Sequence, residues 1–285
     1  MRRCTTASSG QVPVRLEVNY TSTYSYDPQV ARALTALRMR PRERAGLTIE
    51  RSLIRTPGAR IVLSYVDGWG TQVDVVEAAQ ACAEEVFAVD AIVETGVEAG
   101  SDEPSAAELV MFTRDSSRVR QEAIAPLVRE LSLTPRVWGS VETVVSSLPQ
   151  WFTYRVGATN AETPIETVLL TREGVCQDFA HVLIGLLRTW GWAARYVSGY
   201  VYTGSRCGGR IEAEAMHAWV QVYRPEFGWI GLDPTHGGYT DDAYVPVAIG
   251  RDYDDVRPVR GVFSGGPATQ SQRSLLEVTL RTMPQ

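Results

Sequence analysis

The chain has 285 residues, of which 44% are hydrophobic and 21% are charged, and it carries a net charge of -5. These values are typical of a soluble globular protein, and the acidic balance argues against a general nucleic-acid binder. No apolar run reaches the ~18 residues that indicate a membrane span, and the first 11 residues lack the apolar stretch of a signal peptide. We therefore expect a cytoplasmic protein with no membrane partner.

Residues 12–97 have the pattern of a β-rich domain. The strand-like segments, separated by turn residues, are VRLEVNY, ALTALRM, ARIVLSYV and TQVDVVEA. Residues 1–11 before them are predicted to be a disordered tail. Residues 98–117 after them include a polar stretch and are the predicted linker. The remaining residues, 118–285, are then expected to hold a helical connector and a second domain.

The connector is predicted to be helical. Residues Arg120 to Leu131 and Val137 to Phe152 have apolar residues at helical spacing, although each segment contains a proline. Thr163 and Pro164 have the pattern of a helix start, and this short helix should end before Gly174. No internal repeat is visible.

A cysteine follows at the start of the next helix. After Cys176 the apolar residues recur at the spacing of one helical face, and Gly191 ends the pattern. A helix N-terminus has unpaired N–H groups and a partial positive charge, and both stabilise a thiolate, the nucleophilic form. A buried structural cysteine would have the same pattern.

Two predicted strands supply the partners that a nucleophilic cysteine requires. The segment EAEAMHAWVQVY alternates with period two and contains His217, while FGWIGLDPT ends at Asp233. A turn between the segments predicts a hairpin, whose antiparallel pairing would bring His217 and Asp233 together. A carboxylate orients an imidazole, and an imidazolium beside a cysteine keeps the thiolate. Cys176, His217 and Asp233 are therefore the predicted catalytic triad.

Three segments resemble the catalytic motifs of the transglutaminase-like superfamily of papain-like cysteine enzymes, namely GVCQDFAH, MHAWVQVY and WIGLDPT. The resemblance implies an α+β fold, in which a β-rich N-terminal domain precedes a core with a Cys-bearing helix packed on an antiparallel sheet. Residues 12–44 and 67–74 also resemble the N-terminal domain of bacterial members, and residues 248–266 resemble their C-terminal signature. Residue by residue, Cys176 would be the nucleophile, His217 the general base and acid, and Asp233 the orienting carboxylate.

Four further residues are candidates for the oxyanion and substrate sites. Papain-like folds pair the N–H of the cysteine with an upstream donor, which is aromatic in transglutaminases, so the resemblance implicates Tyr154 or Trp151. Gln177 matches the family motif, and Trp219 shares a strand face with His217. Core packing explains the aromatic residues equally well. Trp151, Trp219 and Trp229 are also the residues that could build a water-poor acceptor channel.

The other titratable residues have structural explanations. His181 lies off the face of Cys176 and is expected to be structural, whereas His236 is expected to be a solvated loop residue, the alternative being a place beside the substrate. Asp178 is expected to interact favourably with the dipole of the helix. Cys207 lies in a glycine-rich loop and is expected to be an ordinary thiol, with a redox lock on Cys176 as the alternative.

No metal or disulfide spacing connects the four cysteines, at positions 4, 82, 176 and 207, so neither cofactor nor metal is expected. Reduced thiols are the default in the cytoplasm. In the C-terminal part, Arg251, Asp252 and Asp255 are expected to form a structural ion-pair network.

The predicted function is amide-bond chemistry through a thioester. Attack of the thiolate on an amide releases an amine, and water or a second amine then resolves the acyl-enzyme. Hydrolysis of peptide or isopeptide amides is placed first and acyl transfer second. A non-catalytic binding module is the third possibility. The substrate would be a peptide, a protein or a small amide.

Overall fold

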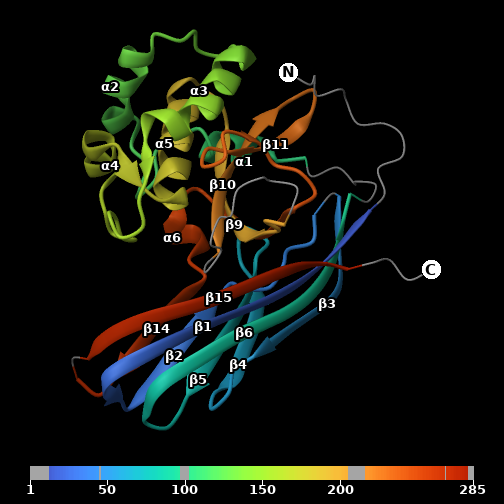
Figure 1. Cartoon of the computed structure of the whole chain (residues 1–285), viewed down its shortest axis with the longest axis vertical. Coiled ribbons are helices and arrows are strands. Elements are labelled where there is room, and N and C mark those ends of the chain that lie inside the picture. Colours follow the sequence, from blue (N-terminus) through green and yellow to red (C-terminus); the bar gives the residue numbers. More distant parts are fainter. Residues whose placement is uncertain (1–12, 45, 97–102, 205–215, 267, 282–285) are drawn as a thin grey trace.

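The computed structural model describes residues 13–44, 46–96, 103–204, 216–266 and 268–281. Figure 1 shows two parts, a β-rich part and, above it, a part in which helices pack against a separate sheet. This mixed α+β arrangement, with antiparallel sheets in the β-rich part, is the predicted fold class. The predicted tail, Cys4 and Cys207 lie outside the described residues.

The β-rich part consists of two four-stranded antiparallel sheets. Their strand orders are β15-β1-β6-β3 and β14-β2-β5-β4. Alternate residues of β1, such as Leu16, Val18 and Tyr20, are buried, as expected for strands with one face on a core. The strands are β1 (Val14–Val30), β2 (Arg32–Leu37), β3 (Leu47–Arg55), β4 (Arg60–Val66), β5 (Gln72–Ala78), β6 (Cys82–Thr95), β14 (Val259–Ser264) and β15 (Thr269–Arg281).

The last two strands correct the predicted domain boundaries. Residues 118–285 were assigned to the second domain, but β14 pairs with β2 and β15 pairs with β1 along most of its length. The β-rich part is therefore built from both ends of the chain. The pattern of a strand is local and does not indicate which sheet the strand joins. The assignment of β14 and β15 to the second domain from sequence alone was therefore wrong.

The predicted linker is also partly wrong. Within residues 98–117, a short helix α1 (Ala106–Met111) begins with a capping box between Ser105 and Glu108. Phe112 after it is buried, and its carbonyl accepts hydrogen bonds from Arg188 Nε and the N–H of Ala194. This segment is polar only at its start, and its second half packs into the core.

The second part has a five-stranded antiparallel sheet of order β12-β11-β10-β9-β13. Its strands are β9 (Ala194–Val201), β10 (His217–Arg224), β11 (Gly228–Asp233), β12 (Gly238–Tyr239) and β13 (Tyr244–Gly250). Its helices are α2 (Gln121–Leu131), α3 (Trp138–Trp151), α4 (Ile165–Thr171), α5 (Cys176–Thr189) and α6 (Tyr253–Val256). The predicted helices are all present, with their limits within a few residues of those expected.

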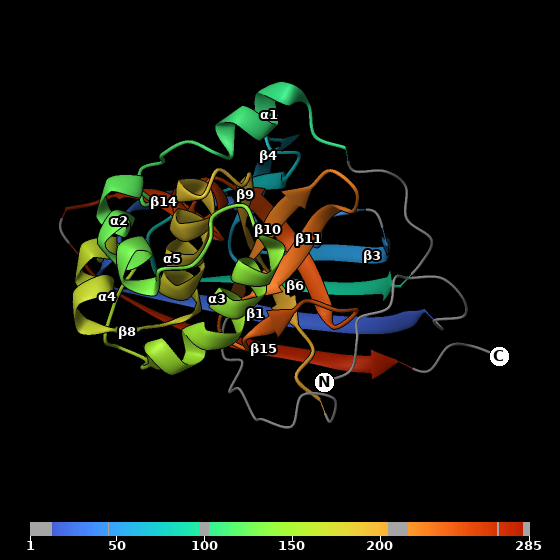
Figure 2. The same cartoon turned by 90° about the horizontal axis from the view of Figure 1, so that it is seen from above.

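Helix α5 is the centre of this part. It packs against β9 and β10 on one side and against α2, α3 and α4 on the other, and Figure 2 shows α2, α4 and α5 grouped beside the sheet. Every residue from Asp178 to Arg188 is buried. The sequence predicted that one face of this helix is buried. The helix is buried on its other faces as well, because the connector helices cover its remaining surface.

The two parts share one hydrophobic core. Tyr20 of β1 and Tyr200 of β9 pack with their ring centroids 5.6 Å apart, and the Tyr200 hydroxyl donates a hydrogen bond of 2.7 Å to the carbonyl of Met39. Buried residues of both parts belong to the same continuous cluster. Over the described ranges, the helices are all too short or too polar to cross a bilayer.

Candidate active site

Cys176 is the first residue of α5, and a two-stranded pairing fixes the chain before it. β7 (Thr153–Tyr154) runs parallel to β8 (Glu173–Gly174), so Tyr154 lies opposite Gly174. The Asp178 carboxylate accepts hydrogen bonds from the N–H of Val175 at 2.9 Å and from Thr159 Oγ1 at 2.6 Å. A Cβ atom at Gly174 would lie 2.7 Å from Asp178 Oδ2, so only glycine leaves room for this cap.

His217 begins β10 and lies opposite Gly199 of β9. A Cβ atom at Gly199 would overlap the carbonyl of Val245 and approach the Trp219 ring, so glycine allows β13 and Trp219 to pack there. Trp219 is buried, and its ring stacks on the His217 imidazole with an interplanar angle of 25°. The strand and the tryptophan together orient the imidazole.

Asp233 ends β11 and holds the other side of the imidazole. Val220 of β10 pairs with Leu232 of β11, so Asp233 lies diagonally across from His217. The distance from His217 Nε2 to Asp233 Oδ2 is 2.8 Å. Asp233 has no solvent exposure. The Asp-Pro sequence turns the chain sharply, so that the N–H of Thr235 donates back to Asp233 Oδ1 at 2.8 Å.

Two further side chains share the Asp233 carboxylate. The Tyr244 hydroxyl donates to Oδ2 at 2.8 Å, and His236 Nδ1 lies 2.5 Å from the same oxygen. His236 also donates from its backbone N–H to Oδ1 at 3.2 Å. His236 is only partly exposed, with 31% of its side chain accessible, and it lines the same cavity as Cys176. The expectation of a freely solvated loop histidine was wrong, because the turn after Asp233 directs His236 back to the carboxylate.

The Cys176 side chain lines the same cavity as the His217 imidazole and interacts with it. Burial alone would lower the pKa of His217, but the charge of Asp233, the hydrogen bond to Asp233 and the interaction with Cys176 outweigh it and raise that pKa to about 10. Burial alone would raise the pKa of Asp233, yet the two histidines hold the pKa of this carboxyl well below its usual range. At neutral pH the site therefore contains a carboxylate and an imidazolium, next to the sulfur.

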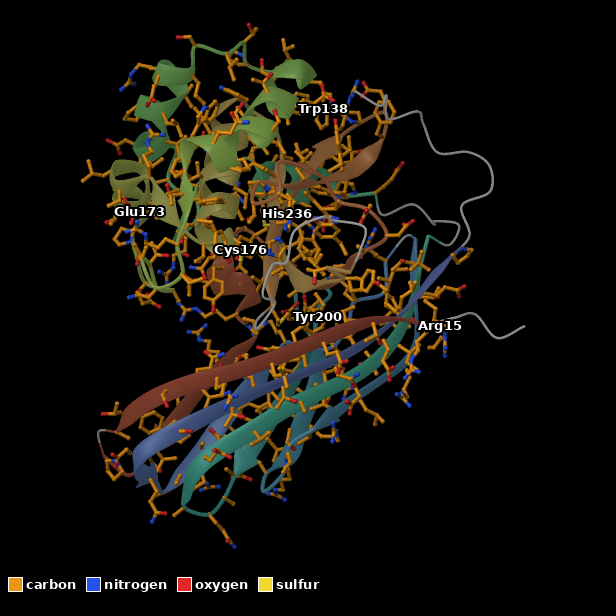
Figure 3. All side chains as sticks on the ribbon, in the orientation of Figure 1. Arg15, Trp138, Glu173, Cys176, Tyr200 and His236 are labelled. Carbon is orange, nitrogen blue, oxygen red and sulfur yellow. The ribbon has the colours of Figure 1, made fainter. Side chains whose placement is uncertain are left out.

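The structure brings the three predicted triad residues together in the expected order, Cys176, His217 and Asp233. Figure 3 places Cys176 and His236 near the junction of the two parts, above Tyr200.

Tyr154 is the oxyanion candidate that lies at the site. Its hydroxyl lies beside the backbone of Cys176, and its ring meets Phe179 edge-on. Burial, with a contribution from the neighbouring Cys176, raises the pKa of Tyr154 to about 12, so the hydroxyl keeps its proton at neutral pH. Trp151 packs against the hydrophobic core at the end of α3 and does not line the cavity.

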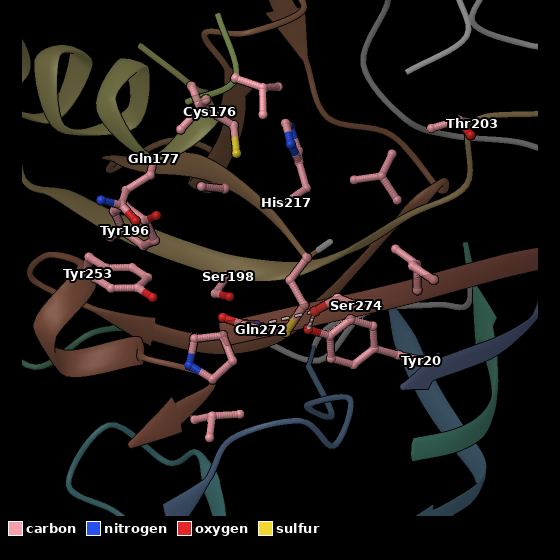
Figure 4. Close-up of a pocket in the computed structure, with 18 of the residues that line it drawn as sticks. Tyr20, Cys176, Gln177, Tyr196, Ser198, Thr203, His217, Tyr253, Gln272 and Ser274 are labelled. Carbon is pink, nitrogen blue, oxygen red and sulfur yellow. Dashed lines mark hydrogen bonds between the residues drawn. The ribbon is translucent and has the colours of Figure 1, made fainter. Parts of the chain in front are cut away.

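A cavity of about 730 Å³ opens in front of Cys176. Figure 4 shows Cys176 and His217 on one side of it, with Gln272, Ser274 and Tyr20 of the β-rich part on the opposite side. The candidate Gln177 lines this cavity, as the family motif implied. None of the described residues that line it is a tryptophan, so Trp219 supports His217 from behind and does not face a substrate.

The sequence matches two families. Residues 130–234 match the transglutaminase-like superfamily, and residues 16–94 match the bacterial transglutaminase-like N-terminal region. One segment of the chain is thus similar to the transglutaminase-like core, and an earlier one is similar to the bacterial transglutaminase-like N-terminal region.

Three relatives show how far this similarity extends. An uncharacterized protein of Mycobacterium tuberculosis is 45% identical over 139 residues, which are 47% of this chain but only 43% of that protein. The chain thus matches less than half the length of this relative. A protein-glutamine gamma-glutamyltransferase of Pseudomonas aeruginosa is 33% identical over 91 residues, 31% of this chain and 14% of that protein. The crystal structure of a candidate cysteine protease from Cytophaga hutchinsonii has a TM-score of 0.78 at 19% identity, over 96% of this chain and 93% of that one, which shows a common fold.

Around the transglutaminase-like core, the remaining candidates are structural. His181 is buried, and its Nε2 accepts a hydrogen bond of 3.2 Å from the N–H of Tyr253. Arg251 forms an ion pair with Asp255, and Asp252 accepts hydrogen bonds from the Ser117 hydroxyl and from the backbone N–H of Arg118 and Asp254. Of the predicted ion-pair network only the Arg251–Asp255 pair is present, while the hydrogen bonds of Asp252 join the start of α6 to the segment before α2.

The residues that could hold a metal ion in the described ranges are His217, Asp233 and His236, whose ligand atoms lie within 4.8 Å of one another. The same atoms are already joined by hydrogen bonds.

Sequence reasoning missed several residues of the site. Tyr244 carries no local signal, because it is one tyrosine in an ordinary strand sequence. His236 was considered only as a possible neighbour of the substrate, although a residue three positions after the aspartate of an Asp-Pro turn can fold back to that aspartate. The residues of β1 and β15 had none, because their place opposite Cys176 depends on how the two parts pack.

Proposed function

We propose that the chain is a cysteine-dependent amide-bond enzyme that acts through a thioester and resolves it mainly with water. The observation that carries this proposal is the position of His217, between the sulfur of Cys176 and the fully buried carboxylate of Asp233. This arrangement places a nucleophile beside its proton carrier, which is itself hydrogen-bonded to a buried carboxylate.

In the first half-reaction, the Cys176 thiolate attacks the carbonyl carbon of the amide, and the carbonyl oxygen becomes an oxyanion. The N–H of Cys176 and the hydroxyl of Tyr154, which are in contact with each other in the free protein, are the groups placed to donate to it. The carbon–nitrogen bond then breaks while the His217 imidazolium gives its proton to the departing amine. This leaves a thioester on Cys176 and a neutral His217.

In the second half-reaction, the neutral His217 takes a proton from water, and the resulting hydroxide attacks the thioester. The carbon–sulfur bond breaks, the acid departs, and the thiolate–imidazolium pair is restored. Water is favoured because the tryptophans Trp151, Trp219 and Trp229, which could have formed a water-poor acceptor channel, do not line the cavity. A transferase would need a bound amine that outcompetes water.

Acyl transfer to an amine is the second candidate. It is supported by the similarity to the Pseudomonas aeruginosa protein-glutamine gamma-glutamyltransferase. In that reaction an amine replaces water as the nucleophile, and His217 takes the proton of the amine.

The size of the cavity supports a small acyl donor or a short segment of a longer chain. Its volume of about 730 Å³ falls within the range of sites that take small molecules, roughly 300–1,000 Å³. We therefore propose peptide amides as the substrate class.

The test supplies a glutamine-containing peptide to the full chain, with and without excess primary amine, and determines the product masses. We expect hydrolysed or deamidated peptide as the main product and amine adducts as a minor share. Cys176→Ala should abolish all products, whereas Cys82→Ala, a cysteine outside the cavity lining, should not. Predominant amine adducts would make acyl transfer the primary activity, and the absence of both products and a trapped thioester would leave a non-catalytic binding module.

A further inference from the structure

The wall that faces Cys176 across the cavity comes from the β-rich part. Tyr20 and Tyr24 of β1 line it, together with Gln272 and Ser274 of β15, the edge strand of its sheet (Figure 4). The chain therefore brings its N-terminal and C-terminal strands to the site formed by α5 and β10.

A connected group of uncharged polar side chains lies on this wall. We refer to Tyr20, Ser22, Tyr24, Gln272 and Ser274 as the β1–β15 polar cluster. The Tyr20 hydroxyl donates to Ser274 Oγ at 3.2 Å, and Gln272 Nε2 donates to Ser22 Oγ at 3.1 Å and to Ser274 Oγ at 3.2 Å. The two serine oxygens are 3.2 Å apart.

The hydrogen-bond capacity of the serines is filled by these contacts. A hydroxyl has one donor and two acceptor sites. Ser274 Oγ accepts from Tyr20 and Gln272, so its own proton must go to Ser22 Oγ. Ser22 Oγ then accepts from Ser274 and Gln272 and has no acceptor site left. Ser22 is fully buried, so water does not alter this count.

Two groups of the cluster remain unused. Both N–H groups of the Gln272 amide are engaged, and its carbonyl oxygen has no partner among the described residues. The Tyr24 hydroxyl interacts with Ser22, and its own hydrogen has no acceptor among the other described residues. Burial raises the pKa of Tyr24, and the phenol therefore keeps this hydrogen at any physiological pH.

The unused acceptor and donor belong to paired residues, because Tyr24 and Gln272 lie opposite each other in the sheet and both line the cavity. An N–H acceptor beside an O–H donor matches the N–H and C=O of an amide group. The cluster itself carries no charge, and the charged residue beside it on β15 that also lines the cavity is Arg273.

We propose that the β1–β15 polar cluster binds a second, uncleaved amide of the acyl donor, through the Gln272 carbonyl and the Tyr24 hydroxyl. The proposal rests on the proposed function, and it specifies the donor as a peptide with at least two amide groups. It also gives the β-rich part a role in substrate recognition, with Tyr24 and Gln272 as specificity-determining residues.

Binding to the inactive Cys176→Ala chain tests the proposal directly. The probe is the peptide N-acetyl-Ala-Gln-Gly-amide, and its Kd is measured by calorimetry. Adding Gln272→Leu or Tyr24→Phe should weaken binding about fivefold to tenfold each, the effect of losing one neutral hydrogen bond. The matched controls are Gln270→Leu and Tyr26→Phe, because this pair is next along the same two strands but outside the cavity lining. Binding that is unchanged by both cluster variants, that weakens equally in the controls, or that is absent at millimolar peptide would overturn the proposal.

Turnover separates this proposal from the proposed function. p-Nitrophenyl acetate acylates a reactive thiol but has no amide, so Gln272→Leu should leave its reaction within about twofold of the parent, while kcat/KM for the peptide falls about fivefold to tenfold. An equal loss on both substrates would mean that the substitution damages the catalytic residues, and it would contradict the proposal. If the parent chain binds the peptide in a cluster-dependent manner but never cleaves it, the proposed function fails and the binding site stands.

Discussion

At the scale of single residues, Asp233 organises the site. Its two oxygens accept hydrogen bonds from the side chains of His217, His236 and Tyr244, and from the backbone N–H groups of Thr235 and His236. Because the carboxylate is buried and so fully hydrogen-bonded, it stays ionised and fixed, and it holds the His217 ring in one orientation. A buried carboxylate with fewer partners would be costly to keep charged.

The pKa of His217 can be checked directly. We expect the imidazolium to persist through neutral pH and to lose its proton with a midpoint of about 10, because Asp233 and Cys176 favour the charged form. In Asp233→Asn the midpoint should fall by several units, since burial then acts against the charge. NMR of the ring nitrogens of labelled His217 measures both values. A midpoint near the ordinary 6.5 in the parent chain would show that Asp233 does not stabilise the imidazolium.

Tyr154 is expected to act on the transition state. Tyr154→Phe keeps the ring packed against Phe179 but removes the hydroxyl that contacts the Cys176 backbone. We expect kcat on a peptide amide to fall about 100-fold with little change in KM, the effect of losing one oxyanion donor. Tyr65→Phe, on an exposed strand of the β-rich part, is the control and should behave as the parent. An unchanged kcat in Tyr154→Phe would assign the tyrosine to packing alone.

At the scale of elements, α5 carries both the chemistry and the structure that supports it. Its first residue is the nucleophile, and Arg188 near its end is buried and donates to the carbonyls of Phe112, Ala194 and Arg251. Burial lowers the pKa of Arg188 to about 10, so it is still charged at neutral pH and offsets the partial negative charge of these carbonyls. The helix is thus anchored to segments on either side of it in the sequence, which keeps Cys176 in place.

His181 makes the stability of this element depend on pH. Burial lowers the pKa of His181 to about 4, despite the opposing charges of Asp252 and Asp254, while Arg118 and Arg188 act in the same direction as burial. Because the pKa is lower in the folded chain than the 6.5 of the unfolded one, the neutral ring stabilises the fold above pH 6.5. That contribution, on the order of 3 kcal/mol, is lost as the pH falls from 6.5 to 4.

Chemical denaturation of the parent chain and of His181→Gln at several pH values tests this. Glutamine can still accept the hydrogen bond from the N–H of Tyr253 but does not titrate, so its free energy of unfolding should depend less on pH between 4 and 6.5. Parallel curves for the two proteins would exclude His181 as the cause. The comparison removes the contributions of carboxyl groups common to both.

At the scale of the whole molecule, the two parts do not have separate cores. β14 and β15 return to the first part, Arg42 donates from its backbone N–H to the carbonyl of Pro246, and Thr95 Oγ1 donates to the carbonyl of Asp242 at 2.7 Å. The cavity is lined from both parts. The site therefore exists only when both parts are folded and packed together.

This shared core predicts a single unfolding transition. Near-ultraviolet circular dichroism reports mainly on the tryptophans of the second part, and hydrogen exchange of the β6 amides reports on the first. We expect both probes to give the same midpoint and the same free energy of unfolding, because neither part can lose its packing alone. Two separate transitions would show that the β-rich part folds independently.

The sequence by itself determined the local features of this protein. Periodicity gave the connector helices and the helix that Cys176 begins, and the turn residues after β11 placed Asp233 at a strand end. The motifs around Cys176, His217 and Asp233 identified the transglutaminase-like core, because each motif is a short segment with its own element type. These features depend on residues close together in the chain, for which the spacing in the sequence predicts the local backbone geometry.

Only the tertiary structure decided what surrounds these motifs. The pairing of β15 with β1, the hydrogen bond from Tyr244 to Asp233 and the place of Gln272 opposite Cys176 join residues far apart in the chain. Several pairings satisfy the same strand pattern, and the one adopted is selected by the burial of the shared core. Spacing along the chain therefore could not predict that β1 and β15 line the cavity, although it predicted the catalytic candidates on the opposite side.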